Sequence, residues 1–399
     1  MNWLKNIALI CITSFVTIAI IEVAFRFYQS WNVEAVESRK IAGLPLHDFE
    51  HHFCYGPKDH QKFDPEVVSR EYENQQYFEF RNQSVALHTY DENGFRIAGS
   101  TEAKENGVIV VGDSFVRGTL ADDTETIPAV LNRWYPDTEF HNFGIGGHGP
   151  KQYLKTYQAN SSTIEHDLVI LVLYLGNDAQ NDLGFESRLA RAKELYELQQ
   201  QRGLSYATKM KIKFAAILDK SAVGDVFLKS YRNLKNKDAV APNAASLPTA
   251  RELSDQLVTS VSEFKAYTDS VGKKLQLVTI PSREYFDSER FPVWQQEFAV
   301  EVTDHMEAAL DDFAEGHGLP PVVHILPMLQ AEFDKGKALE RIYGWPDAHF
   351  TEYAYFLTAR EISNALASSL GYSPVATSEF VNATEFDPAH LNCPSAVES

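Results

Sequence analysis

Cysteine is scarce in this chain, and positively charged residues are far fewer than negatively charged ones. Its 399 residues include three cysteines, and 36 lysines and arginines stand against 55 aspartates and glutamates, which gives a formal net charge of −19. A protein that binds nucleic acid, or that is held on anionic lipid, needs lysines and arginines concentrated on one surface. The charge balance therefore argues against both classes of partner.

Charge is missing altogether from one stretch near the N-terminus. No charged residue occurs from Asn6 to Ile21, which is close to the ~20 apolar residues that a membrane-spanning helix needs. Lys5 precedes the run, as is typical of an N-terminus that stays in the cytoplasm. No small-residue cleavage pattern follows it. We therefore expect residues 1–27 to be an uncleaved transmembrane anchor, with the rest of the chain outside the cytoplasm (the periplasm, in a bacterium).

The three cysteines have different expected environments. Cys11 lies in the expected anchor, and Ile10 stands before it where lipid attachment would require a small residue, so we interpret Cys11 as a membrane-buried thiol. Cys54 and Cys393 would lie outside the cytoplasm, where one disulfide could form. The sequence leaves this pairing open, because it does not show whether their Cα atoms come close enough.

Short, unbroken apolar runs predict the strands of a buried parallel sheet. The expected strands are Gly107–Val111, Glu139–Phe143, Leu168–Leu175, Leu275–Ile280 and Val322–Leu326. Helical patterns are found at Thr126–Trp134, Lys151–Asn160, Phe291–Glu315 and Thr351–Leu370. This alternation predicts a doubly wound α/β fold with a five-stranded parallel sheet, whose ligands bind beyond the carboxyl ends of the strands.

The remaining segments define the expected domain organisation, and no internal repeat is found. Residues 28–105 form a mixed lead-in, and residues 106–370 the α/β domain. Charged helical stretches at about residues 185–265 predict a helical insertion. Residues 371–399 form a tail with little periodicity.

Polar clusters follow the first three expected strands. Gly112, Asp113 and Ser114 end the first, the glycine-rich run that includes Gly147 ends the second, and Asn177 follows the third. A serine at a strand-to-helix corner lies beside free backbone N–H groups, which stabilise a developing oxyanion. Gly147 lets a second N–H approach, and the Asn177 amide supplies a third donor. The clusters predict an acyl-transfer site with Ser114 as nucleophile and Ser114, Gly147 and Asn177 as the oxyanion hole.

A serine hydroxyl needs a base to take its proton, and the base is usually a histidine oriented by a carboxylate. Many of the thirteen histidines lie in the lead-in segment or on expected helices. Of the others, two have an aspartate two or three residues before them: Asp347 precedes His349, and Asp387 precedes His390. His349 comes after the last expected strand, where the chain returns over the strand ends. We therefore expect His349 with Asp347 to serve Ser114, and Asp387 with His390 remains the alternative.

These motifs together resemble the SGNH hydrolases, also called the GDSL esterase/lipase superfamily. The four marker residues of that family correspond here to Ser114, Gly147, Asn177 and His349, over about residues 90–180 and 270–370. One departure is that the aspartate stands two residues before His349, whereas the commonest family spacing is three. The spacing of three occurs instead at Asp387 and His390.

The resemblance implies a flavodoxin-like α/β/α sandwich with esterase or O-acyltransferase chemistry, without a metal or an organic cofactor. The run from Asn93 to Arg96, together with the expected anchor, is similar to membrane-anchored bacterial members that act on envelope material. The expected substrate is therefore an acylated small molecule or polysaccharide, such as a carbohydrate O-acetyl ester. Neither the acyl chain, the acceptor alcohol nor the oligomeric state follows from the sequence.

Two other functions fit parts of the sequence. A membrane-tethered carbohydrate-binding or scaffolding protein with an inactive site is one alternative. The other is a dinucleotide-binding protein, because Gly144–Gly149 matches the G-x-G-x-x-G pattern. That pattern requires an acidic residue at the end of the next strand, whereas Glu165 and Asp167 fall at its start.

Overall fold

The computed structural model describes residues 61–81, 84–99, 104, 106–202, 248–287, 291–344 and 348–373. The chain divides into two units, Met1–Lys40 with Leu195–Leu247, and Ile41–Glu194 with Pro248–Ser399. Residues 195–202 are the described part of the first unit, and all the other described residues belong to the second. The expected anchor, all three cysteines and residues 374–399 lie outside the described residues. Within the described ranges, no helix combines the length and the apolarity that crossing a membrane requires.

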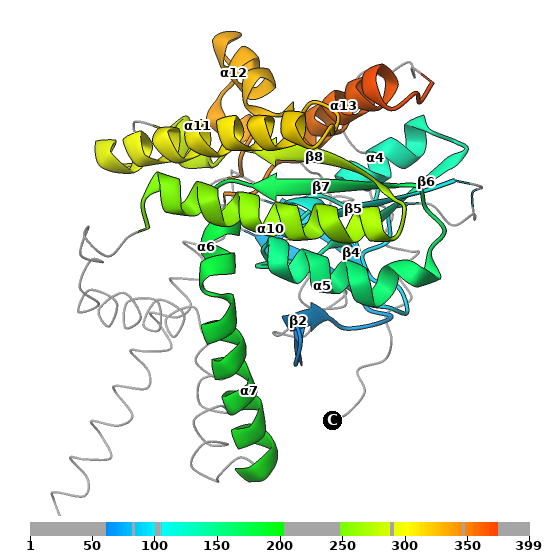
Figure 1. The fold of residues 1–399 in the computed structure, drawn as a ribbon. Coiled ribbons are helices and arrows are strands. Elements are labelled where there is room, and N and C mark those ends of the chain that lie inside the picture. The colour runs from blue at the N-terminus through cyan, green and yellow to red at the C-terminus, as the bar shows by residue number, and fades with distance from the viewer. Residues whose placement is uncertain are drawn as a thin grey trace, which may run out of the picture. The chain divides into compact units, whose positions relative to one another are not determined.

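A five-stranded parallel sheet forms the centre of the second unit (Figure 1). Its strands are β5 (Asn106–Gly112), β6 (Thr138–Gly144), β7 (Leu168–Tyr174), β8 (Lys274–Ile280) and β9 (Val323–His324), in the spatial order β6-β5-β7-β8-β9. In chain order this arrangement is 2-1-3-4-5, the flavodoxin-like order. The expected five-stranded parallel sheet is confirmed, and the strand order reverses beside β5, which leads directly to Ser114.

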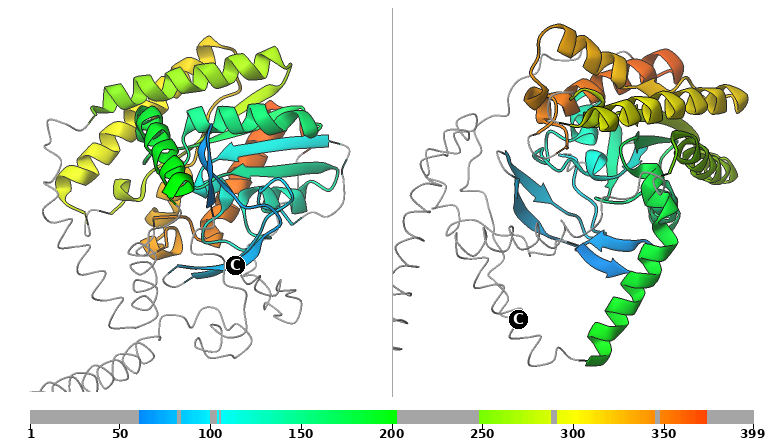
Figure 2. Two further views of the ribbon diagram at one scale, coloured as in Figure 1. Left: turned by 90° about the horizontal axis from the view of Figure 1, so that it is seen from below. Right: turned by 90° about the vertical axis from the view of Figure 1, so that its left-hand side faces the viewer.

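Helices cover both faces of this sheet (Figures 1 and 2). One face is covered by α4 (Ile127–Trp134), α12 (Leu326–Asp334) and α13 (Glu352–Ser369), and the other by α5 (Pro150–Asn160), α10 (Ala250–Ser270) and α11 (Val293–Gly316). Short helices α3 (Ser114–Arg117) and α6 (Asp178–Leu183) follow β5 and β7, and α7 (Phe185–Arg202) follows α6. Single 3-10 turns occur at Ser161–Thr163, Arg283–Tyr285 and Leu339–Arg341.

Alternation along the buried strands explains the two-sided packing. Val108 and Val110 of β5 face the cluster that includes α4 and α13, whereas Ile109 and Val111 face the cluster of α5, α10 and α11. All four side chains are fully buried. Burial of each such side chain contributes about 1.5–3 kcal/mol, which is why an unbroken apolar run identifies a central strand.

Two elements differ from the sequence-based expectation. The expected last strand, Val322–Leu326, is only the two residues Val323–His324, because Leu326 begins α12 and Pro327 takes the first turn of that helix. The second difference is α10, which begins within the range expected for a helical insertion, about residues 185–265, and continues to Ser270. It instead packs Leu253, Leu257 and Phe264 against the sheet as the crossover helix between β7 and β8.

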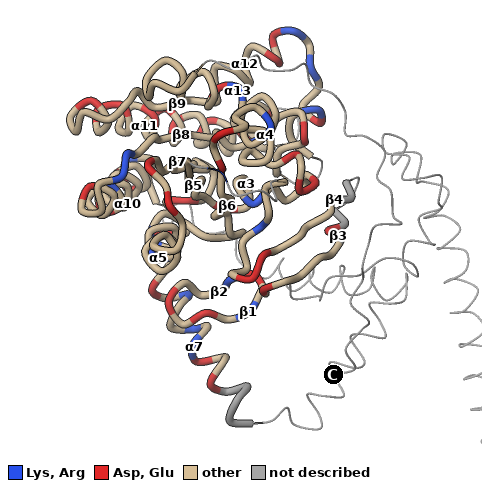
Figure 3. Tube along the Cα trace, turned by 90° about the vertical axis from the view of Figure 1, so that its right-hand side faces the viewer, with Lys and Arg blue, Asp and Glu red and all other residues tan. Residues whose placement is uncertain are grey.

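The lead-in forms two antiparallel hairpins that the sequence did not reveal. The first hairpin consists of β1 (Gln61–Asp64) and β2 (Val68–Glu71), and the second of β3 (Gln76–Arg81) and β4 (Ser84–Thr89). Figure 3 shows acidic segments where the two hairpins meet, below α3 in that view. Each hairpin contacts α3, because Glu71 of β2 and Glu79 of β3 both pair with Arg117.

Candidate active site

The turn between β5 and α3 presents the Ser114 hydroxyl at the carboxyl edge of the sheet. Asp113 is the N-cap residue of α3, and its carboxylate accepts a 2.8 Å hydrogen bond from the N–H of Phe115. Burial raises the pKa of Asp113, while the bond from Phe115 opposes that shift. Asp113 therefore braces the corner that holds Ser114, and the N–H of Ser114 lies in the first helical turn, where amides lack a partner within the helix.

The structure brings His349 to Ser114. The His349 Nε2 atom lies 2.6 Å from the Ser114 Oγ atom, although 235 positions separate the two residues. In the tautomer that carries its proton on Nδ1, Nε2 accepts the hydroxyl proton. The Ser114 Oγ also lies 3.4 Å from the Asp113 carboxylate, which is the longer and weaker of these two contacts. The pair has the geometry of a nucleophile and its general base.

Backbone hydrogen bonds between residues 343–344 and 349–350 hold the loop that carries His349. Tyr343 and Phe350 form an antiparallel bridge, and the N–H of Gly344 donates a 2.8 Å hydrogen bond to the carbonyl of His349. The imidazole lies beside the ring of Phe115, with 5.2 Å between ring centres. Asp347, the expected carboxylate partner, lies outside the described residues, as do Asp387 and His390. The role of Asp347 therefore stays a prediction.

The expected oxyanion donors lie on the loops after β6 and β7. Gly147 has a φ of +77°, a conformation that favours glycine, and no heavy atom lies within 4 Å of the position that a Cβ would occupy. Asn181 links the two loops, because its amide nitrogen lies 3.3 Å from the Asn177 Oδ1 and 3.1 Å from the carbonyl oxygen of His148. With its oxygen turned to Asn181, Asn177 directs its own N–H₂ group away from that contact. The role of both donors stays a prediction.

Asp178 supports the loop after β7 from within the core. Its carboxylate accepts hydrogen bonds from the Tyr153 hydroxyl at 2.8 Å and from the N–H of Tyr174 at 3.0 Å. Burial, reinforced by the nearby negative charge of Asp113, raises the pKa of Asp178 well above its ordinary value. Asp178 thus orders the turn that begins at Asn177.

Several buried polar residues near Ser114 were not among the site residues that the sequence predicted. Arg96 is buried, pairs with Asp123 at 2.9 Å and donates a 2.8 Å hydrogen bond to the carbonyl of Arg117, the last residue of α3. Arg117 itself pairs with Glu71 at 3.1 Å and with Glu79 at 3.2 Å. Only Arg96 had a sequence signal, its place in the Asn93–Arg96 run. Through these contacts the two arginines attach the lead-in hairpins to α3.

His148 makes the loop after β6 sensitive to acid. Its Nε2–H donates a 2.8 Å hydrogen bond to the carbonyl of Ser69, and burial lowers the pKa of His148 to about 4. The unfolded chain binds this proton near pH 6.5, so the stability that His148 contributes is complete above that pH and falls as the pH drops toward 4. We expect the free energy of unfolding to fall by about 2 kcal/mol between pH 7 and pH 5 through this residue.

The substitution His148→Gln tests this expectation. Glutamine keeps an N–H donor for the Ser69 carbonyl but does not titrate, so urea denaturation should show a smaller loss of stability between pH 7 and pH 5 than in the wild type. His305→Gln, at an exposed position of α11, is the matched control. Equal losses in His148→Gln and the wild type would show that His148 is not responsible.

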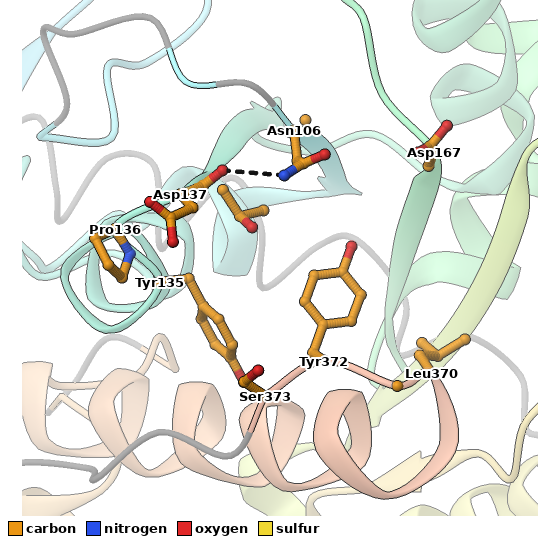
Figure 4. A pocket seen from close by; sticks show the side chains of 11 residues that line it. Asn106, Tyr135, Pro136, Asp137, Asp167, Leu370, Tyr372 and Ser373 are labelled. Carbon is orange, nitrogen blue, oxygen red and sulfur yellow. Dashed lines mark hydrogen bonds between the residues drawn. The ribbon is translucent and has the colours of Figure 1, made fainter.

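A cavity of about 510 Å³ lies at the other edge of the sheet (Figure 4). It is lined by Asn106 at the start of β5, Asp167 just before β7, and the rings of Tyr135 and Tyr372. Ligands of doubly wound folds bind beyond the carboxyl ends of the strands, where Ser114 lies. The cavity faces the amino ends, so it is separate from the candidate active site.

Two of the three glycines of the G-x-G-x-x-G match, Gly144 and Gly149, have packing roles in this fold. A Cβ on Gly144 would lie 2.1 Å from the backbone nitrogen of Arg117, and one on Gly149 would lie 2.7 Å from a carboxylate oxygen of Asp182. The acidic residues Glu165 and Asp167 precede β7, at the amino edge of the sheet. In the described part of the chain, no group of three or more His, Cys, Asp or Glu side chains is arranged to hold a metal ion.

Comparison with known proteins finds likeness in structure only. No profile of a known protein family matches the chain, and no curated protein matches its sequence. Similar solved structures include a lipolytic protein of the G-D-S-L family from Desulfitobacterium hafniense, 13% identical, with a TM-score of 0.37 over 66% of this chain and 100% of that one.

Two more similar structures have the same TM-score. A lipase/acylhydrolase from Enterococcus faecalis is 12% identical and matches over 65% of this chain and 95% of its own, with a TM-score of 0.37. The acetylxylan esterase Axe2 from Geobacillus stearothermophilus is 11% identical over 69% of this chain and 99% of its own, also with a TM-score of 0.37. The structural neighbours thus include named members of the GDSL family, which the motifs of this chain resemble.

Proposed function

We propose that this chain is a serine esterase or O-acyltransferase of the SGNH type, which forms an acyl-enzyme on Ser114. The observation that carries the proposal is the 2.6 Å contact between the Ser114 Oγ and the His349 Nε2, at the carboxyl edge of a parallel sheet. A non-catalytic binding protein has no need for a hydroxyl aligned on a histidine. The contact therefore favours the enzyme over the inactive scaffold.

The reaction begins when Ser114 attacks the carbonyl carbon of an ester and His349 takes the hydroxyl proton. The carbonyl oxygen becomes an oxyanion, which accepts hydrogen bonds from the N–H groups of Ser114 and Gly147 and from the Asn177 amide. The carbon–oxygen bond to the alcohol then breaks, and His349 gives its proton to the departing alkoxide. Asp347 is proposed to orient the imidazole and to stabilise its positive charge.

The second half of the reaction transfers the acyl group from Ser114. A water molecule or a sugar hydroxyl attacks the acyl carbon while His349 accepts its proton. The Ser114–acyl bond breaks, and His349 returns the proton to the Ser114 oxygen. Water gives a carboxylic acid, and a sugar hydroxyl gives a new ester.

We propose a carbohydrate O-acyl ester as the substrate and a membrane-tethered location outside the cytoplasm. The support is the Asn93–Arg96 run and the uncharged run from Asn6 to Ile21.

A fluorophosphonate probe tests the proposed nucleophile directly. An activated serine displaces fluoride from the phosphorus and keeps the phosphonyl group, so the intact folded protein should gain the mass of one adduct. Fragmentation should place that adduct on Ser114. Heat-denatured protein is the control and should stay unlabelled, because activation depends on the folded contact with His349. A folded protein that takes up no probe, or that carries it on another serine, would contradict the proposal.

A further inference from the structure

The peptide between Gly146 and Gly147 is held by a side chain from the first hairpin. The Gln61 Nε2 donates a 3.2 Å hydrogen bond to the carbonyl oxygen of Gly146. In a planar trans peptide, the C=O and the N–H point in opposite directions. A donor that fixes the Gly146 carbonyl therefore also fixes the direction of the Gly147 N–H, the proposed second donor of the oxyanion hole.

This peptide needs such a restraint because glycine stands on both of its sides. Neither Gly146 nor Gly147 has a side chain to limit rotation, and Gly147 has open space around its Cβ position. Rotation of the peptide would turn the N–H away and present a carbonyl oxygen, which repels an oxyanion. The hydrogen bond from Gln61 opposes that rotation.

Gln61 is itself linked to α3, the helix that begins at Ser114. The Ser69 hydroxyl donates to the Gln61 Oε1 at 3.1 Å, and the Gln61 Nε2 also donates to Glu71 at 3.0 Å. The same Glu71 oxygen accepts a 3.1 Å hydrogen bond from Arg117, three residues after Ser114 in α3. The hydrogen bonds from Arg117 to Glu71, and from Gln61 to Glu71 and Gly146, thus connect α3 to the Gly146 carbonyl.

Three further hydrogen bonds fix the position of the residues around this peptide. The His148 Nε2 lies 2.8 Å from the Ser69 carbonyl, and the Gln152 Nε2 lies 2.6 Å from the Val67 carbonyl. From the other side, Arg188 donates to the carbonyl of Gly147 at 3.3 Å. The hairpin β1–β2 is therefore joined to the loop at several points, and among these contacts the one from Gln61 reaches the peptide that carries the Gly147 N–H.

We propose that Gln61 is a positioning residue, which aims the Gly147 N–H at the oxyanion through its hydrogen bond to the Gly146 carbonyl. This proposal rests on the proposed function. A donor that is already aimed stabilises the transition state without reorganisation, so Gln61 should act on the chemical step rather than on substrate binding.

The substitution Gln61→Met tests this role, because methionine keeps the length of the side chain and removes the N–H donor. For an aryl acetate, kcat should fall about 10- to 100-fold while KM stays within about twofold, since losing one oxyanion donor outright costs about 10²–10³. The affinity for a boronic acid, which forms a tetrahedral adduct with the serine, should fall by the same factor as kcat. A structural defect alone would not make these two losses equal.

Gln76→Met is the matched control, because the Gln76 amide donates to Thr89 within the second hairpin and not to the loop after β6. It should leave kcat and boronic acid affinity unchanged. Ser69→Ala, which removes the anchor of Gln61, should give a smaller loss in the same direction and serves if Gln61→Met does not fold. Unchanged kcat in Gln61→Met, or a rise in KM with kcat unaffected, would overturn the positioning role.

The two proposals fail in different ways. If Ser114→Ala abolishes turnover while Gln61→Met and Ser69→Ala keep full kcat, only the role of Gln61 is wrong. If the wild type neither turns over an ester nor reacts with a fluorophosphonate, the proposed function is wrong, and the role of Gln61 is wrong with it.

Discussion

Ser114→Ala is expected to lower kcat/KM for an aryl acetate by about 10⁵-fold, which corresponds to about 7 kcal/mol of transition-state stabilisation. Without the Oγ atom no acyl-enzyme forms, and water must attack the ester directly. Among the described residues, that oxygen contacts the side chains of His349 and Asp113, at the rim of the core, so its loss should leave the fold intact. Steady-state hydrolysis over a range of substrate concentrations measures the effect.

Ser270→Ala, at the exposed C-terminal end of α10, is the matched control and should keep wild-type kcat. Both variants should unfold at the same temperature as the wild type within about two degrees. Retention of more than about one per cent of wild-type turnover by Ser114→Ala would show that the nucleophile lies elsewhere.

His349→Ala is expected to lower kcat/KM by about 10⁴-fold, whereas His390→Ala should leave it unchanged. The reason is geometric, because His349 places a ring nitrogen 2.6 Å from the Ser114 hydroxyl. Without that nitrogen, no positioned group takes the hydroxyl proton. Hydrolysis of an aryl acetate by the two variants measures the difference.

Added imidazole distinguishes loss of the base from loss of structure. In His349→Ala the missing ring leaves space beside Phe115, and free imidazole should restore part of the activity in a concentration-dependent way. The same addition should not change His390→Ala or Ser114→Ala. Loss of activity in His390→Ala, with full activity in His349→Ala, would reverse the assignment of the base.

The parts of the fold that the sequence predicted well are those in which burial dictates residue type. β7 is buried along its whole length, and its sequence from Leu168 to Tyr174 is an unbroken apolar run. The short β9 was overestimated because Ile325 and Leu326 continue its apolar run, although Ile325 is already the N-cap residue of α12. Hydrophobicity marks burial, but the start of a helix decided where that strand ends.

The lead-in hairpins escaped prediction for a related reason. Burial in β1 and β2 is intermediate except at the buried Glu71 and does not alternate, so their residues lack the period of two that identifies a half-buried strand. Gln61 and Glu71 are polar residues whose partners, Gly146 and Arg117, lie far along the chain. Local sequence carries no signal for a hydrogen bond over such a separation.

Ser114 itself followed from sequence, because a strand that ends in Gly-Asp-Ser places the serine at a corner by local geometry alone. The same reasoning predicts Gly147 and Asn177 as oxyanion donors, since parallel strands bring their carboxyl ends to one edge, and these two roles stay predictions. Only the tertiary structure showed the contact of His349 with Ser114 and the side chain that holds the peptide before Gly147. These contacts depend on where α13 and the hairpin β1–β2 pack, and packing is a property of the whole core rather than of any one segment.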